Sequence, residues 1–155
     1  MMKAKGPASA VVDTNLVISG LIKKVGVPYE VVEAFRRGDF TLVLSASLGE
    51  EYRRVLKRPV FAQRYGLTPE AVAAFLFLVE TSARWVNPRR RLPTMPRDQK
   101  DARVLAAAVG GRAEYLVTGD MDLLALKDNS ALGALRIVTA REFLDVLRWA
   151  GHDEP

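Results

Sequence analysis

Four carboxylates occupy positions from which strands and helices can bring side chains to one site. Asp13 directly follows a short apolar run, and Asp120 follows another by way of Gly119. Ligands of open α/β sheets bind outside the carboxyl ends of the strands, so both side chains are expected to face such a site. Glu51 stands in the first turns of an expected helix, and Asp101 opens another. Because helices that follow strands begin at the same sheet edge, we expect the four acids to converge there.

Converging carboxylates repel one another and raise one another's pKa, a cost that a bound divalent cation removes. Mg²⁺ and Mn²⁺ prefer oxygen ligands, and either ion can polarise a phosphoryl oxygen and lower the pKa of a bound water. The chain has no cysteine, which excludes thiolate sites, and its single histidine, His152, lies three residues from the carboxyl end. A histidine-based triad is therefore not expected. The residue types favour Mg²⁺ or Mn²⁺ held by oxygen ligands.

The elements that would position these acids follow from the alternation of short apolar runs with stretches of helical spacing. This pattern predicts parallel strands joined by helical crossovers. We therefore expect an α/β fold, a three-layer α/β/α sandwich around a mainly parallel five-stranded sheet. The expected strands, all mostly buried in character, are 10–12, 41–44, 84–86, 115–117 and 136–138.

Capping signals predict where the helices begin and end. Ser47 and Glu50 have capping-box spacing, which leaves Glu51 to the site; exchange of the roles of the two glutamates is the alternative. Three of the other acids also have a purely structural alternative. Asp13 could cap a helix, and Asp120 and Asp122 could belong to a simple Gly-Asp turn. The expected helices are 29–37 between Pro28 and Gly38, 71–81 after Thr68, 101–109 before Gly110, and 143–150 after Thr139 and Glu142, with Gly151 as its stop. Residues 87–97 are expected to form a loop.

Length and composition fit one globular domain, which we place at 8–150 with flexible termini at 1–7 and 151–155. The chain has 155 residues, 49% of them hydrophobic and 26% charged, with a net charge of +5. Its longest apolar stretch, 71–79, falls far short of the roughly 20 residues of a membrane-spanning helix. No signal-type apolar region precedes Asp13, so we expect a cytoplasmic protein without a membrane segment.

Four segments together resemble the PIN domain family. The resemblance extends over 9–149, and the order and spacing of the segments agree with the family. Its end, VTGDMDLL followed by RIVTAREFLDVL, is similar to the bacterial and archaeal PIN subgroup of toxin components, the VapC-like proteins. The four segments are VVDTN at 11–15, EYRRVL at 51–56, DARVLAAA at 101–108 and LVTGDMDLL at 116–124.

The resemblance implies a PIN-like ribonuclease that cleaves RNA phosphodiester bonds with Mg²⁺ or Mn²⁺. It also implies a small antitoxin protein as partner and a homodimer or higher oligomer. Asp13, Glu51, Asp101 and Asp120 match the family's acidic quartet, expected to be catalytic and to ligate the metal. Asp122 matches a further acid, expected to be an auxiliary ligand or one that acts through water.

Three further residues are expected to support the ligands. Asn15 matches the polar residue of the first family motif and is expected to orient Asp13 by a hydrogen bond. Thr118 precedes Asp120 by two positions, and Asp98 is expected to cap the helix of Asp101 in preference to contacting metal. The chain has Ala102 where close relatives often carry another acid.

Basic residues are expected to hold the polyanionic substrate. Setting aside the five candidate ligands leaves 13 acids against 23 Lys and Arg, and such a surround attracts phosphates. Phe75, Phe77, Trp85 and Trp149 are expected in the core or an interface, not as platforms for base stacking. The basic candidates are Arg89, Arg90, Arg91, Arg97 and Lys100 near Asp101, followed by Arg53 and Arg54.

Other functions remain open from the residues alone. A phosphatase or receiver domain also places an aspartate after its first strand, but a dehalogenase-type phosphatase would have a second Asp where this chain has Asn15. A catalytically silent PIN scaffold that binds RNA or protein is a second alternative, and a housekeeping RNA-processing nuclease is a third.

Overall fold

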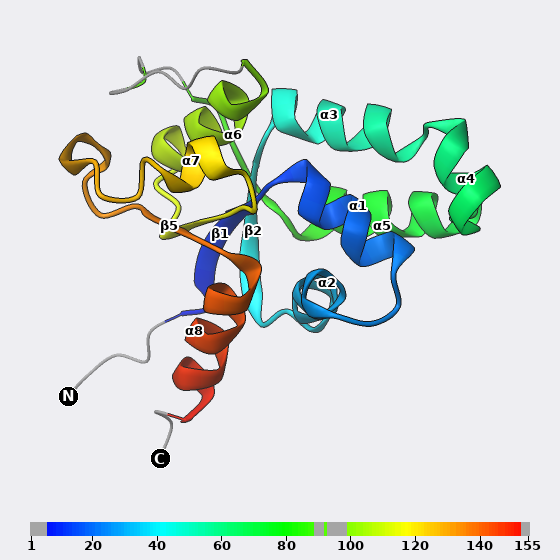
Figure 1. Cartoon of the computed structure of the whole chain (residues 1–155), viewed down its shortest axis with the longest axis horizontal. Helices are drawn as coiled ribbons and strands as arrows, with labels where there is room; N and C mark the ends of the chain where they lie inside the picture. Colours follow the sequence, from blue (N-terminus) through cyan, green and yellow to red (C-terminus); the bar gives the residue numbers. More distant parts are fainter. Residues whose placement is uncertain (1–5, 89–91, 93–98, 153–155) are drawn as a thin grey trace.

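The computed structural model describes residues 6–88, 92 and 99–152, which form one parallel sheet with helices on both faces (Figure 1). In chain order the elements are β1 (Ala8–Val12), α1 (Thr14–Ile22), α2 (Val27–Arg37), β2 (Phe40–Ser45), α3 (Ala46–Leu56), α4 (Pro59–Tyr65), α5 (Pro69–Ser82), β3 (Arg84–Val86), α6 (Gln99–Gly110), β4 (Tyr115–Val117), α7 (Met121–Leu124), the 3₁₀ turn η1 (Ser130–Leu132), β5 (Arg136–Val138) and α8 (Ala140–His152).

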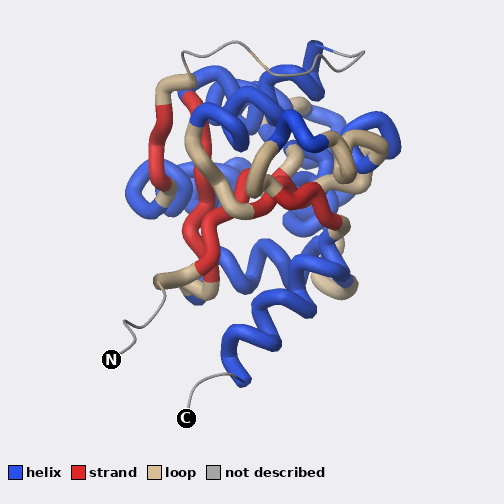
Figure 2. The backbone as a smooth tube through the Cα atoms, turned by 90° about the vertical axis from the view of Figure 1, so that its left-hand side faces the viewer, coloured by secondary structure: helices blue, strands red, loops and turns tan. Residues whose placement is uncertain are grey.

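The sheet has the strand order β3-β2-β1-β4-β5, and all neighbouring strands are parallel. Helices α1–α5 lie on one side of it and α6 and α7 on the other (Figure 1). Turned by 90°, the strands run between helical segments (Figure 2). The predicted α/β sandwich with five strands is confirmed, and the sheet is parallel throughout.

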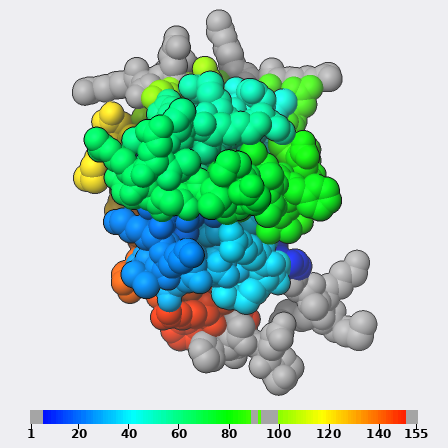
Figure 3. Space-filling view, turned by 90° about the vertical axis from the view of Figure 1, so that its right-hand side faces the viewer, coloured from blue at the N-terminus to red at the C-terminus, as the bar shows by residue number. Residues whose placement is uncertain are grey.

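The central strands are buried on both faces, as parallel sheets covered by helices require. Val11, Val43, Leu44 and Leu116 have no exposed surface. On the side of α1–α5, the molecular surface is formed by α3–α5 above and by α1 and α2 below (Figure 3). Burial of these apolar side chains, worth about 25 cal/mol per Å², holds the sheet and therefore the strand ends in place.

Several predicted helix ends are confirmed. Oγ1 of Thr68 accepts a hydrogen bond from the amide of Ala71 at 3.1 Å, which caps α5. Helix α2 ends at Arg37 and is capped by Gly38, whose φ of 79° suits glycine. The capping box before α8 is formed: the amide of Thr139 donates to Oε1 of Glu142 at 2.9 Å, and the amide of Glu142 donates to Oγ1 of Thr139 at 3.2 Å.

Other details correct the sequence-based expectations. Helix α8 continues through Gly151 to His152, because a glycine near a helix end weakens a helix without stopping it. Helix α4 was not predicted, although Pro59 at its start and Gly66 after it, with φ of 66°, are ordinary boundary signals. The described part of the expected loop 87–97, residues 87, 88 and 92, has no regular secondary structure.

The expectation of buried strands fails for β3. Arg84 and Trp85 are exposed because β3 is an edge strand. Among the aromatic residues, Phe75 lies in the core, whereas Phe77 and Trp149 are 67% and 70% exposed. A core role is therefore wrong for Phe77, Trp85 and Trp149, and an interface role stays a prediction.

Candidate metal centre

The site begins where β1 and β4 end side by side. Val12 and Val117 are register partners, and Asp13 and Thr118 follow them directly. The chain proceeds from β1 towards β2 on one side, whereas β4 leads to β5 on the other. Neighbouring strands that lead in opposite directions form a topological switch point, which is where open α/β sheets bind ligands.

All four acids that the sequence placed at this edge line one cavity of about 440 Å³, here called the acid cavity. They come from four segments: Asp13 from the end of β1, Glu51 from α3, Asp101 from α6 and Asp120 from the turn before α7. Burial of the sheet and packing of α3 against α6 bring together residues that are distant in sequence.

Three carboxylates at this edge have the spacing of a cation site. Asp101, Asp120 and Asp122 each offer one oxygen, and these oxygens all lie within 4.8 Å of one another. Mg²⁺ binds oxygens at 2.0–2.1 Å, so opposite ligands of an octahedral ion lie about 4.2 Å apart. The donor set therefore fits a small divalent cation.

Asp13 is held from the neighbouring strand. It stands at the N-cap position of α1 without a side-chain capping bond, and its Oδ2 accepts a hydrogen bond from Oγ1 of Thr118 at 2.8 Å. Burial raises the pKa of Asp13, opposed by this hydrogen bond and reinforced by the charges of Asp120 and Glu51. A cation beside Asp13 would reverse this cost by stabilising the charged form.

Asp120 combines a local and a tertiary role. Its Oδ1 caps α7 by accepting from the amides of Asp122 and Leu123 at 2.8 and 3.1 Å. This is the local turn that the sequence analysis gave as the alternative role of Asp120. Its own amide donates to Oγ1 of Thr118 at 3.0 Å. The bonds that form the turn also fix the carboxylate at the acid cavity.

Of the two adjacent glutamates, Glu51 faces the acid cavity and Glu50 faces solvent. The expected capping box of Ser47 and Glu50 is wrong. Ser45 is the cap instead, and its Oγ accepts from the amide of Leu48 at 3.1 Å, because the helix begins directly after β2. The earlier helix start leaves Glu51 pointing inward.

Contacts to Glu51 reveal two residues that sequence reasoning missed. Oγ1 of Thr14 donates a hydrogen bond to Oε2 of Glu51, and NH1 of Arg103 lies 3.5 Å from Oε1. The only signals in the sequence were that Thr14 adjoins Asp13 and that Arg103 follows Asp101 by two positions. Neither signal indicates that Thr14 or Arg103 contacts Glu51.

A fully buried tyrosine supports the strand that carries Asp13. The hydroxyl of Tyr52 donates to the carbonyl of Val12, the last residue of β1. Burial raises the pKa of Tyr52 well above its ordinary value, and the negative charges of Asp13 and Glu51 raise it further. Tyr52 therefore remains a neutral donor.

The supporting residues predicted from sequence lie in different places. Thr118 bonds both Asp13 and Asp120, as described above. Asn15 is exposed on the wall of the acid cavity, and its backbone amide, not its side chain, hydrogen-bonds Asp13 and lowers the Asp13 pKa. The side-chain hydrogen bond to Asp13 comes from Thr118. Asp98 lies outside the described residues.

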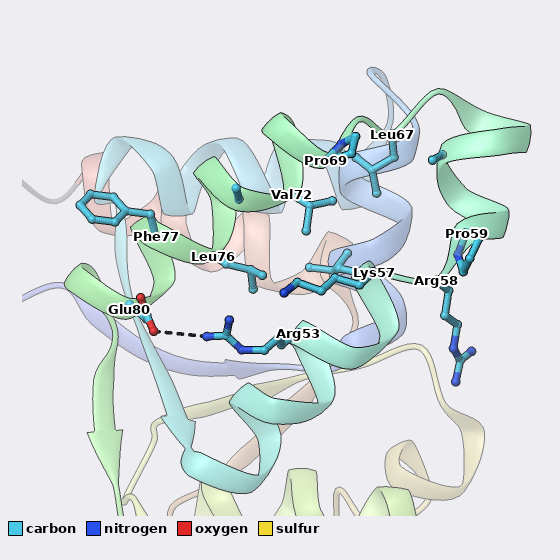
Figure 4. Close-up of a pocket in the computed structure, with 13 residues that line it drawn as sticks. Arg53, Lys57, Arg58, Pro59, Leu67, Pro69, Val72, Leu76, Phe77 and Glu80 are labelled. Atoms are coloured by element: carbon cyan, nitrogen blue, oxygen red, sulfur yellow. Dashed lines mark hydrogen bonds and ion pairs between the residues drawn. The ribbon is translucent and has the colours of Figure 1, made fainter.

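Basic side chains adjoin the acid cavity. Arg54, Arg58 and Lys100 line it, and Arg58 was not predicted. Arg53 lies instead on a second groove between α3, α4 and α5, which also borders Arg58, and its NH2 is 3.3 Å from Oε1 of Glu80 (Figure 4). The other basic candidates, Arg89, Arg90, Arg91 and Arg97, lie outside the described residues.

Comparison with known families identifies this chain at the level of family. A PIN domain profile matches residues 9–122, so the chain belongs to the PIN domain family. PIN domains are generally metal-dependent nucleases that act on RNA. Searches of curated proteins and of solved structures give no significant match. Within the described part of the chain, no helix combines the length and apolarity needed to cross a bilayer.

Proposed function

We propose that this protein is a Mg²⁺- or Mn²⁺-dependent endoribonuclease, formed by a single domain at 8–150. The observation that carries the proposal is the acid cavity, which gathers the four acids named from the sequence at the switch point of the sheet. Family membership supports the reaction class. The composition supports an oxygen-ligated cation, because the chain lacks cysteine and has one histidine.

The side chains divide into two groups with different tasks. Asp13, Glu51, Asp101 and Asp120 hold the cation, directly or through water, and Asp122 is an auxiliary ligand or one that acts through water. Arg54, Arg58 and Lys100 bind the phosphates of the RNA backbone and place one of them at the acids. When bound, the divalent ion supplies a Lewis acid for the phosphate and lowers the pKa of a water.

The arrangement of the acids supports in-line hydrolysis of the RNA phosphodiester bond. The Thr118 hydroxyl holds Asp13 and the turn of Asp120 in one fixed geometry, so their carboxylates need little reorganisation when substrate binds. A water held beside these carboxylates would attack the phosphorus in line with the leaving oxygen.

The cellular role proposed is that of a VapC-like toxin, acting in the cytoplasm as a homodimer or higher oligomer and neutralised by a small antitoxin. This part of the proposal rests on the resemblance of the segments ending in VTGDMDLL. Induced expression should then arrest growth in the wild type and not in a cleavage-inactive variant. A short reading frame beside the gene should relieve the arrest.

Cleavage of labelled RNA tests the nuclease assignment. We expect cleavage with Mg²⁺ or Mn²⁺, none with EDTA, and none from Asp120→Asn. An asparagine oxygen still accepts from the amides of Asp122 and Leu123, so this variant keeps its fold. Asp128→Asn, an exposed site outside the acid cavity, is the matched control. Equal cleavage by wild type and Asp120→Asn would refute the assignment of a metal-dependent nuclease.

A further inference from the structure

The acid cavity has an apolar wall in addition to its acids. Ile18, Val55 and Phe61 line the same cavity as the carboxylates. Val55 follows Glu51 by four residues on α3, so its side chain lies on the same face of the helix and about 6 Å further along the axis. Helix α4 lies at the end of α3 that points away from the sheet (Figure 1). The cavity therefore extends from the acids along α3 to the start of α4.

Helix α4 brings an aromatic pair to this apolar wall. Phe61 is partly buried and packs against the core, and the centroid of its ring lies 6.4 Å from that of Tyr65, with the ring planes tilted by 35°. The side chain of Tyr65 is 54% exposed. None of the seven residues of α4 is buried, so core packing accounts for little of the aromatic surface that this helix carries.

Two arginines stand beside the aromatic wall. Arg54 on α3 and Arg58, directly before α4, line the cavity together with Phe61. The amide of Phe61 donates to the carbonyl of Arg58 at 3.2 Å, which fixes the backbone between the ring and the guanidinium. Proteins that hold single-stranded nucleic acid combine cations that follow the phosphates with aromatic rings on which bases stack. Both components are present in the cavity that holds the acids.

We propose that Phe61, with Ile18 and Val55, forms a base-binding subsite that takes one unpaired nucleobase of the RNA whose phosphate is held at the acids. The base stacks on the Phe61 ring, while Arg54 and Arg58 bind neighbouring phosphates. A base inside a duplex is already stacked on its neighbours, so its face cannot reach the ring. The subsite therefore restricts the nuclease to single-stranded RNA. This inference rests on the proposed function and adds the class of substrate to it.

A double-mutant cycle between protein and RNA tests the contact. Phe61→Leu keeps an apolar side chain and removes the ring, and an abasic residue replaces each nucleotide of a labelled single-stranded RNA in turn. RNA binding is measured by fluorescence anisotropy in the Asp120→Asn background. With intact RNA, Phe61→Leu should weaken binding by about 5- to 100-fold. An abasic residue at one position should have a similar effect, and at that position the two changes together should cost little more than either alone.

Three controls accompany the cycle. Phe61→Tyr keeps a ring and should bind RNA as the parent protein does. Phe77→Leu removes an aromatic ring that is 67% exposed on the second groove and should leave binding unchanged. The wild type with Mg²⁺ should cleave a single strand in preference to the same sequence in a duplex.

The outcomes separate failure of the subsite from failure of the proposed function. If the wild type cleaves no RNA and Asp120→Asn binds none, the proposed function is refuted and the subsite with it. If RNA is bound and cleaved, but no abasic position weakens binding or the two effects multiply at every position, the inference is overturned and the nuclease stands. Equal cleavage of single strand and duplex would overturn it as well. If urea unfolding shows that Phe61→Leu does not fold, Phe61→Met, which fills the space with a flexible chain, takes its place in the cycle.

Discussion

Oγ1 of Thr118 donates a hydrogen bond to Oδ2 of Asp13 at 2.8 Å, across 105 positions of sequence. The same hydroxyl accepts from the amide of Asp120 at 3.0 Å. Thr118 is fully buried, so no water replaces either bond. One hydroxyl therefore sets the relative position of two acids that follow neighbouring strands.

Thr118→Val removes this hydroxyl at nearly constant volume. We expect the loss to cost about 1–3 kcal/mol of unfolding free energy, because buried Asp13 loses its donor. Mn²⁺ affinity should fall about tenfold, as it does when a group that orients a ligand is removed. Urea unfolding in EDTA and calorimetric titration measure the two effects. Thr118→Ser, which keeps the hydroxyl, should stay close to the wild type in both.

Asp13→Asn should stabilise the metal-free protein. Burial raises the pKa of Asp13 in the folded state, so its charged form lowers stability at neutral pH, and this cost disappears as pH falls through the raised pKa. Removing the charge should raise Tm by about 2–4 °C per kcal/mol relieved. Thermal unfolding in EDTA between pH 3 and 8 should give a gain at pH 7 that vanishes in acid. Asp145→Asn, an exposed site, should give no such gain.

Two adjacent arginines provide a matched test of RNA binding. Arg54 lines the acid cavity, whereas Arg53 pairs with Glu80 on the second groove between α3, α4 and α5. In the Asp120→Asn background, Arg54→Gln should weaken RNA binding and reduce the salt slope of log K by about 0.7, the value for one phosphate contact to a single strand. Arg53→Gln should leave the slope unchanged. Filter binding over a salt series measures both, and equal slopes would refute the placement of RNA at the cavity.

The capping box before α8 predicts a pH dependence away from the site. The hydrogen bond from the Thr139 amide holds the pKa of Glu142 below its ordinary 4.5, helped by the Thr139 hydroxyl. Glu142 therefore stabilises the fold above pH 4.5 and loses this effect as pH falls through the lowered pKa. Glu142→Ala should cost about 0.3–1.5 kcal/mol at pH 7. In urea unfolding, a loss that persists unchanged at pH 2–3 would contradict this assignment.

Much of the fold was predictable because its signals are local. Apolar runs gave the positions of all five strands, and the caps at Thr68 and Thr139 gave helix starts within a few residues. Exposure of Trp85 was not predictable, because a strand of three residues, only two of them apolar, does not reveal whether it lies at the edge or in the centre of a sheet. The predicted cap before α3, Ser47, was wrong because Ser45 and Ser47 are both suitable capping residues and the local pattern does not distinguish them.

The sequence by itself determined that acids follow two strand ends and stand in the first turns of two helices, since strand and helix boundaries depend on neighbouring residues. Only the tertiary structure decided that Thr118 holds Asp13 and that Thr14 and Arg103 engage Glu51. These contacts join elements far apart in the chain, and their geometry depends on how β4 lies against β1 and how α6 packs on α3. Side-chain partners across such contacts are set by burial of the whole core, which no local pattern encodes.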